Sequence, residues 1–294
     1  MSVELPLVRI EGVGFWASRL PGWGIARAVM RDEQSAPDAA RSRPTPTLLA
    51  PTERRRAPDT VAIALEVASQ ACAAANRKPA ELSSVFASTH GDLAISDYLC
   101  ATLAETPALI SPVKFHNSVH NAAAGYWSIG VGSHAPYTAL SAFESTFAAG
   151  LLEAATQAVC DDRPVLYVAF DIEAKGPLST VTPSCGLLGA ALVLAPCEAS
   201  GGATSGAERS GAAHATRLAL QVEAGADPRT DMLGTDVVST IATTPARSAA
   251  AAAVSGNAMA ACLPFFEALA SERSGEVLLQ LNRNAALRSR LIFP

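Results

Sequence analysis

The stretch YTALSAFES, residues 137–145, decides the fold, because it predicts a strand that turns sharply into a helix. Residues 137–142 are mostly β-branched or apolar, residues 145–160 are rich in alanine and leucine, and PVLYVAF at 164–170 predicts a second, buried strand. A strand-to-helix corner holds its side chain over a sheet edge, beside the free N–H groups of the helix start, and several enzyme families place a serine or cysteine nucleophile there. Here the corner carries Glu144, and a carboxylate is a far poorer acyl-transfer nucleophile than a thiolate. We therefore predict an acyl-transfer type of corner that has lost its attacking atom.

The composition bounds the class of protein. The chain has 294 residues, of which 49% are apolar and 17% charged, a balance that suits an α/β protein with helices on both faces of its sheet. So few charges also predict a large apolar surface that a partner covers. The formal net charge of −5 gives no reason to expect nucleic acid or an anionic membrane as a partner.

The sequence also indicates a compartment. We find no basic start followed by an apolar core and a cleavage site, and no apolar run of membrane-spanning length, so we expect a cytoplasmic protein without an integral membrane segment. The six cysteines lie far apart and form no CxxC pair. Cys72, Cys160 and Cys262 lie in alanine-rich helical stretches and are predicted to be buried, and Cys185 is also interpreted as a buried thiol.

Periodicity predicts alternating strands and helices, which favours a largely parallel sheet between helix layers. Residues 31–60 are interpreted as a surface excursion with a solvated arginine triplet at 54–56, residues 110–115 as a loop or short extended piece, and residues 197–213 as a flexible connection. The predicted strands are 8–17, 83–88, 137–142, 164–170, 186–195, 218–224 and 276–282, and the predicted helices are 58–76, 93–104, 145–160 and 259–271.

Two blocks of residues carry a resemblance to a known family. VHNAAAG at 119–125 and ALSAFES at 139–145, followed by a helix that ends near Glu153–Ala154, resemble the N-terminal half of a β-ketoacyl synthase over roughly residues 8–195. The resemblance implies the thiolase fold, an α/β architecture with layers αβαβα. It also places Glu144 where active members carry the acyl-accepting cysteine.

The departures from the family's pattern lie in the C-terminal half. Active members carry two histidines there, whereas His214 is the only histidine after Ala195 in this chain and lies in neither of the family's settings. The chain beyond the flexible connection is also too short for a full second half. The resemblance therefore implies a ketosynthase-like N-terminal half at 1–195, a connection at 196–214 and a reduced C-terminal half of the same fold at 215–294.

This profile resembles the chain length factors, which lack the cysteine and pair with an active β-ketoacyl synthase. NSVHNAAAGYW at 117–127 resembles the partner subunits of aryl polyene systems, in which a ketosynthase elongates a chain on an acyl carrier protein. The resemblance implies no catalytic residue and no cofactor. It implies two partners, the active ketosynthase and the carrier with its acyl chain, and an acyl tunnel that crosses the subunit interface. The residues assigned to the tunnel or the interface are Ser118, Asn121, Ala124, Gly125, Tyr126, Trp127, Tyr137, Leu140, Phe143, Glu144 and Ser145.

Several of these residues keep a second interpretation. Glu144 either lines the tunnel or caps the helix start, where a carboxylate is favourable. Phe143 either blocks an acyl pocket or fills core. Tyr126 and Trp127 are either interface anchors or ordinary core residues.

No metal site is expected. His116 and His120 are four residues apart and are predicted to share a helix face, but the third protein ligand that a zinc site needs is missing. Hydrogen bonds at a subunit contact are the better interpretation of this pair.

Two other functions stay open at this point. One is an enzyme that decarboxylates the malonyl group on its carrier protein with Glu144. The other is a homodimeric module that docks acyl chains or the carrier.

Overall fold

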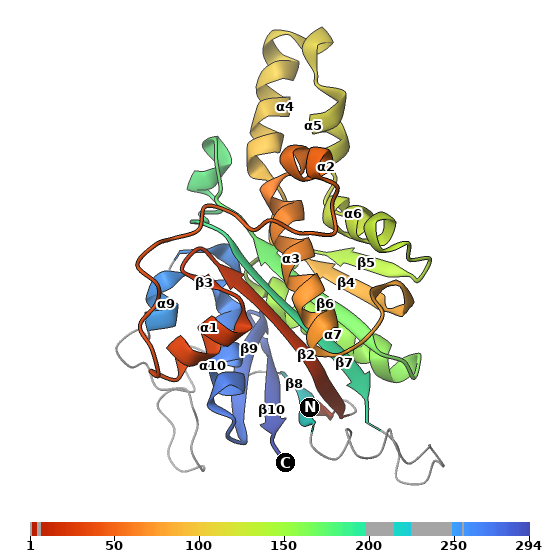
Figure 1. The fold of residues 1–294 in the computed structure, drawn as a ribbon, viewed down its shortest axis with the longest axis vertical. Helices are drawn as coiled ribbons and strands as arrows, with labels where there is room; N and C mark the ends of the chain where they lie inside the picture. Colours follow the sequence, from red (N-terminus) through yellow and green to blue (C-terminus); the bar gives the residue numbers. More distant parts are fainter. Residues whose placement is uncertain (1, 5–6, 198–214, 225–248, 255) are drawn as a thin grey trace.

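The described residues form a ten-stranded mixed sheet with helices on both of its faces (Figure 1). The computed structural model describes residues 2–4, 7–197, 215–224, 249–254 and 256–294. The strand order is β5-β4-β6-β7-β2-β8-β10-β9, and β1 pairs with β8 and β3 with β2. The strands are β1 (Ser2–Glu4), β2 (Val8–Ala17), β3 (Leu20–Pro21), β4 (Ser83–Ala87), β5 (Tyr137–Leu140), β6 (Val165–Asp171), β7 (Leu188–Pro196), β8 (Thr216–Ala224), β9 (Gly275–Asn282) and β10 (Ala285–Ile292).

The prediction of a largely parallel sheet is wrong. Among the described strands, only β4 with β5 and β4 with β6 pair in parallel, and the pairs from β6 onwards are antiparallel. Parallel neighbours need a long crossover, usually a helix, and the chain supplies one between β4 and β5 and one between β5 and β6. Between β6 and β7, residues 172–187 hold only the short 3-10 helix η4 (Pro177–Thr180), so β7 returns antiparallel.

Helices α3 (Asp59–Ala74) and α6 (Ala122–Val131) cover one face of the sheet. Helices α1 (Trp23–Met30), α7 (Thr146–Cys160) and α10 (Leu263–Ser271) cover the other. Helix α7 contacts β4, β6 and β7 and also β9, so it packs against both the N-terminal strands and a C-terminal one. These layers confirm a thiolase-like α/β fold with a reduced second half.

Helix α3 lies directly on β2, because glycines remove the side chains that would separate them. A Cβ atom at Gly12 would collide with the carbonyl oxygen of Ala71, and one at Gly14 would collide with that of Val67. The backbone of the helix therefore rests on the backbone of the strand. This contact explains why the opening strand contains glycines, which the sequence alone does not explain.

The C-terminal strands end the sheet with charge on their outer face. Arg288 of β10 donates to Glu223 of β8 and to Glu276 of β9, each at 2.6 Å, and Arg290 donates to Glu276 at 2.6 Å. Opposite charges across neighbouring strands stabilise a sheet.

Strand β10 was not predicted from the sequence, in which the strand at 276–282 was expected to be the last one. The predicted connection at 196–214 lies almost entirely outside the described residues.

Helix α4 (Leu93–Glu105) and helix α5 (Pro112–Asn117) form an arm that projects from the body (top of Figure 1). The expectation of a loop or extended piece at 110–115 is wrong, because Pro112 opens α5 and the hydroxyl of Ser111 accepts the N–H of Lys114. Proline is tolerated in the first turn of a helix. The arm is held together by Tyr98, whose hydroxyl accepts the N–H of Ser111 at 3.2 Å and whose ring lies 3.5 Å from the Lys114 ammonium.

Two predictions about cysteines fail. Cys72 and Cys262 are buried as expected, but Cys160 and Cys185 are exposed. Cys160 is the last residue of α7 and lies at its solvent end, and Cys185 lies in the loop before β7. The arginine triplet forms the second half of a short helix, α2 (Pro51–Arg56), inside the predicted excursion. Among the described residues, the helices are too short or too polar to cross a membrane.

Candidate functional site

The predicted corner is present, and its backbone is strained at one residue. Strand β5 ends at Leu140, and the 3-10 turn η3 (Phe143–Ser145) leads into α7. Phe143 has φ 54°, a left-handed conformation that costs a non-glycine residue roughly 1–2 kcal/mol. Phe143 is 59% exposed and Glu144 is exposed, whereas Ser145 is buried. The corner therefore presents Phe143 and Glu144 outward and keeps Ser145 inside.

A threonine that the sequence analysis did not single out closes the corner. The hydroxyl of Thr146 accepts the N–H of Ala142 at 3.0 Å and donates to the carbonyl of Phe143 at 2.6 Å. Serine and threonine near a helix start often bond to the local backbone in this way, and that is the signal that could have found it.

A buried carboxylate lies under the corner, at the carboxyl ends of the parallel strands. Asp171, the last residue of β6, is fully buried. It accepts the hydroxyl of Ser88 at 2.8 Å and the N–H of Thr89 at 3.0 Å, both from the segment that follows β4. Burial raises the pKa of Asp171 above its usual value, and the hydrogen bonds from Thr89 and Ser88 and the nearby His90 only partly oppose this.

The raised pKa of Asp171 predicts a pH-dependent stability. A carboxyl group whose pKa is higher in the folded than in the unfolded state stabilises the fold fully below its unfolded pKa, and this contribution is lost as the pH rises through the folded pKa. Relative to Asp171→Asn, the wild-type chain should therefore lose stability from about pH 4 upward until Asp171 is fully ionised. Urea unfolding of both proteins between pH 4 and 8 measures the difference. A difference that stays constant with pH would contradict the prediction.

Two further hydrogen bonds extend from the Ser88–Thr89 segment to the surface. Ser141, just after β5, donates its hydroxyl to the carbonyl of Thr89 at 2.7 Å. The Nε2 atom of His120 lies 2.9 Å from the carbonyl oxygen of Ser88. The corner and the turn between α5 and α6 are thus joined to the same buried carboxylate, Asp171.

His116 and His120 do not share a helix face. Helix α5 ends at Asn117 and α6 begins at Ala122, so a turn separates the two histidines. The ring of His116 instead meets that of Tyr126 edge to face, with centroids 6.2 Å apart. The helix-face prediction missed the break, because the small residues of this block suit a helix throughout. Within the described residues, groups of three or more possible metal ligands are absent.

The predicted tunnel residues divide between two hollows and the core. Asn121, Gly125 and Tyr126 line a hollow of about 380 Å³ on the α6 side, together with Leu48, Leu49, Val119 and Ile129. Glu144 lines a second hollow of about 310 Å³, with Phe147, Ala148, Leu279 and Gln280.

Two of the assigned residues lie in the core of the chain. Ala124 is 0% and Trp127 1% exposed, which agrees with the core interpretation kept for Trp127, and their assignment to the tunnel or the interface stays a prediction. They lie on the face of α6 that packs against the sheet. Ser145 is also buried, at 6%. Tyr126 on the same helix is only partly buried.

The remaining assigned residues lie at or beside the edge strand. Tyr137 of β5 is 40% exposed and accepts the side-chain amide of Asn121 at 3.1 Å. Leu140 is partly buried against the core, and Ser118 donates to the carbonyl of Phe115 within the turn. The structure therefore brings the α5–α6 turn and β5 together, with the corner at the end of the same strand.

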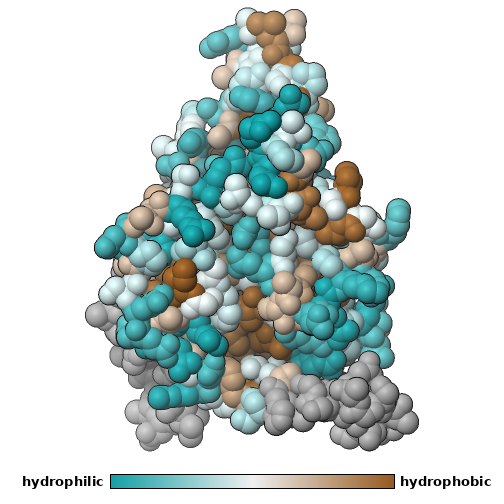
Figure 2. Space-filling model, viewed as in Figure 1, coloured by the Kyte–Doolittle hydropathy of each residue, from teal (hydrophilic) through white to brown (hydrophobic). Residues whose placement is uncertain are grey.

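The exposed large apolar side chains lie on the arm, the α5–α6 turn, α6, β5, the corner and η4. Every large apolar side chain that is exposed among the described residues lies between residues 103 and 181. Figure 2 shows hydrophobic residues at the tip of the arm, away from the body. We call this set the apolar face; it comprises Leu103, Leu109, Val113, Phe115, Val119, Ile129, Tyr137, Phe143, Leu178 and Val181.

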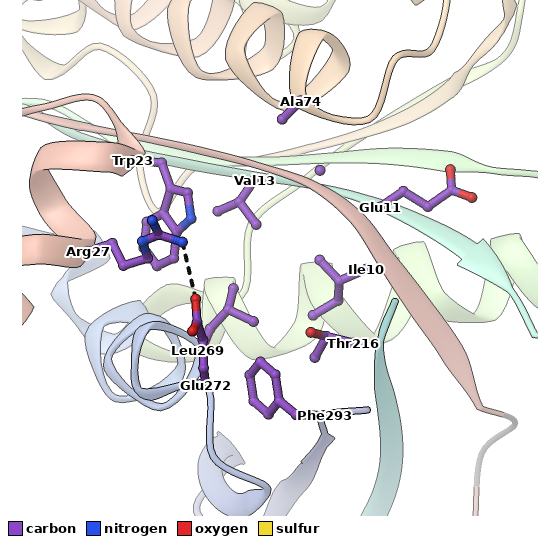
Figure 3. A pocket seen from close by; sticks show the side chains of 11 residues that line it. Ile10, Glu11, Val13, Trp23, Arg27, Ala74, Thr216, Leu269, Glu272 and Phe293 are labelled. Carbon is purple, nitrogen blue, oxygen red and sulfur yellow. Dashed lines mark hydrogen bonds and ion pairs between the residues drawn. The ribbon is translucent and has the colours of Figure 1, made fainter. Parts of the chain in front are cut away.

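A third hollow, of about 230 Å³, lies where β8 stops pairing with β2 (Figure 3). The side chain of Arg27 donates to Glu272 at 3.1 Å beside Trp23 and Phe293. Glu11, which also lines this hollow, bonds to arginines outside it. With its carboxylates paired and its walls mostly apolar, this hollow offers no reactive group.

Comparison with known proteins gives one family and several structures. Residues 29–251 match the family described as "Beta-ketoacyl synthase, N-terminal domain". A search of curated protein sequences gives no match.

Three of the similar solved structures contain a ketosynthase with a chain length factor or with an acyl carrier protein. A chain of the ketosynthase ApeO in complex with its chain length factor ApeC, from Xenorhabdus doucetiae, is 19% identical with a TM-score of 0.65, over 96% of this chain and 98% of that one. A chain of the ishigamide ketosynthase/chain length factor is 15% identical with a TM-score of 0.68, over 97% and 99%. A chain of AntDE:AntF, a type II polyketide acyl carrier protein with its ketosynthase, is 12% identical with a TM-score of 0.69, over 99% and 100%. At these identities the likeness concerns the fold.

Proposed function

Because this chain belongs to the β-ketoacyl synthase N-terminal domain family, we propose that it is a chain length factor. In this role it pairs with an active ketosynthase, closes one side of the acyl tunnel and so limits the length of the product. The partner supplies the attacking thiolate and both histidines, since the corner of this chain reads Phe143-Glu144-Ser145 and its only histidine after Ala195 is His214.

One observation carries the proposal: β5 is the last strand of the sheet, and the described residues pair with only one of its edges. The carbonyls of Pro136 and Leu140 accept hydrogen bonds from β4 at 3.1 and 3.2 Å. Since successive residues of a strand alternate, the N–H and C=O groups of Tyr137 and Ala139 point outward. A free edge of this kind is a template for a strand of another chain. We infer that the matching strand of the ketosynthase pairs with it.

The apolar face supports the same arrangement. An arm that projects from the body and carries Leu109, Val113 and Phe115 at 54% exposure or more gains stability only when another chain covers it. The arm is held in shape by Tyr98, so it meets the partner already folded. We propose that the arm extends the contact beyond β5.

The partners that we propose are the active ketosynthase and an acyl carrier protein that delivers the growing chain to the pair. The solved complexes of ketosynthases with chain length factors and with a carrier support this set of partners by likeness of fold. The stretch at 117–127, which resembles the partner subunits of aryl polyene systems, supports an aryl polyene type of product.

Phe143 is the residue that we propose as the end of the tunnel. Phe143→Ala should shift the products of the pair toward longer chains, with the ratio of longer to shorter products changing on the order of tenfold, because each methylene group in an apolar pocket is worth about that much discrimination. Mass spectrometry of carrier-bound products measures the ratio. Phe143→Leu, which keeps most of the bulk, is the control, and an unchanged ratio in the alanine variant would contradict this assignment.

Co-expression tests the proposal as a whole. A cognate ketosynthase should co-purify with this chain in equal amounts, and the ketosynthase alone should make no products or products of irregular length. If the chain purifies as a monomer and the ketosynthase works equally well without it, the proposal is wrong. Native mass measurement separates the pair from a homodimer of this chain, which is the arrangement that a docking module would form.

A second candidate function rests on the hollow beside Glu144. A carboxylate at the mouth of a cavity of about 310 Å³ offers an acid or base to a bound malonyl group. Under this hypothesis the isolated chain releases carbon dioxide from malonyl carrier protein, and Glu144→Gln abolishes the release. A wild-type chain that releases none eliminates this candidate.

A further inference from the structure

The surface that meets the proposed partner is tied to the interior by a small set of hydrogen bonds. The pairing of β5 with β4 ends where the N–H of Ser88 donates to the carbonyl of Leu140 at 3.2 Å. One residue later, the two segments are joined by a side chain, since the hydroxyl of Ser141 donates to the carbonyl of Thr89 at 2.7 Å. The segment that carries Phe143 is therefore held by the Ser141 hydroxyl at its start, by the N–H of Ser145 on the carbonyl of Ala142, and by Thr146 at its end.

Ser88 is the centre of this set. Its hydroxyl donates to Asp171 at 2.8 Å and accepts the N–H of Gly91 at 3.0 Å, and its carbonyl oxygen lies 2.9 Å from Nε2 of His120. Because Asp171 is fully buried, the segment that receives Ser141 and His120 is fixed relative to the sheet.

We propose that Ser141 and His120 are positioning residues, which hold the corner and the α5–α6 turn as one rigid wall on the Ser88–Thr89 segment. This inference rests on the proposed function, since the wall matters only if it limits a growing chain. A left-handed residue such as Phe143 relaxes when its surroundings no longer hold it. A wall that relaxes accepts products of several lengths, whereas a fixed wall selects one.

Ser141 offers the sharper experiment, because it is exposed and its removal leaves the core untouched. Ser141→Ala deletes the bond to Thr89, and Ser141→Thr keeps a hydroxyl at the same position. Thr156→Ala is the matched control, since it removes an exposed hydroxyl that donates to Leu152 at 2.8 Å within α7.

The first measurement uses the isolated chain and needs no partner. Amide hydrogen exchange at residues 141–145 should be about two- to tenfold faster in Ser141→Ala than in the wild type, the range expected for one lost hydrogen bond. Ser141→Thr and Thr156→Ala should exchange at the wild-type rate there. Equal rates in Ser141→Ala and the wild type would overturn the inference and leave the proposed function untouched.

The second measurement uses the pair with its ketosynthase. Ser141→Ala should broaden the distribution of product lengths severalfold, with Ser141→Thr restoring the wild-type distribution and all variants binding the partner equally well. Faster exchange without a broader distribution would overturn the positioning role. A wild-type chain that does not change the product of its ketosynthase would instead contradict the proposed function, and the role of the wall with it.

Discussion

Ala139→Pro should lower the affinity of this chain for its ketosynthase on the order of a hundredfold. The N–H of Ala139 points away from β4, so we expect it to donate across the subunit interface. Proline removes that donor and leaves a buried carbonyl of the partner unsatisfied, at a cost of about 1–3 kcal/mol in addition to the lost hydrogen bond. Titration of labelled ketosynthase with each variant measures the dissociation constant.

The geometry of β5 allows this substitution without unfolding the chain. Proline is accepted in an edge strand where the missing N–H faces outward, and it favours the extended conformation that Thr138 already has. Ala139→Val is the matched control, since it adds a side chain of similar size and keeps the N–H. An Ala139→Pro chain that folds, as judged by its thermal unfolding, and still binds like the valine variant would show that β5 is not the contact strand.

The sequence predicted the corner well because its signals are local. Alternation along 137–142, an alanine- and leucine-rich helix and a second apolar strand each arise from neighbouring residues, and the structure has all three elements at nearly the predicted positions. Strand direction failed for the opposite reason. Whether β7 pairs parallel or antiparallel with β6 depends on the path of residues 172–187, which have no periodic pattern of their own.

The parts of the site that the sequence missed depend on contacts between distant segments. Asp171 ends an apolar strand and has no motif around it, so only the folded chain shows that Ser88 and Thr89 come from 82 or 83 residues away to bond it. Ala124 and Trp127 were assigned to the tunnel or the interface by resemblance, with ordinary core packing as the second interpretation of Trp127, and only the folded chain shows that both are buried. Helix α6 begins only at Ala122, after the break that follows Asn117, and it packs against the sheet with the face that carries Ala124 and Trp127.

The role of the glycines in β2 likewise becomes apparent only in the folded chain, where α3 packs directly on them. Gly14→Ala should destabilise the chain by at least about 3 kcal/mol, because its methyl group collides with the carbonyl oxygen of Val67 and neither backbone has room to move. Gly24→Ala in α1 is the matched control: a Cβ there meets nothing within 4 Å, and alanine should stabilise the helix by about 0.5–1 kcal/mol. Chemical denaturation of the two variants beside the wild type measures both effects. If Gly14→Ala unfolds at the wild-type denaturant concentration, the direct contact of helix and strand is not what holds α3 on the sheet.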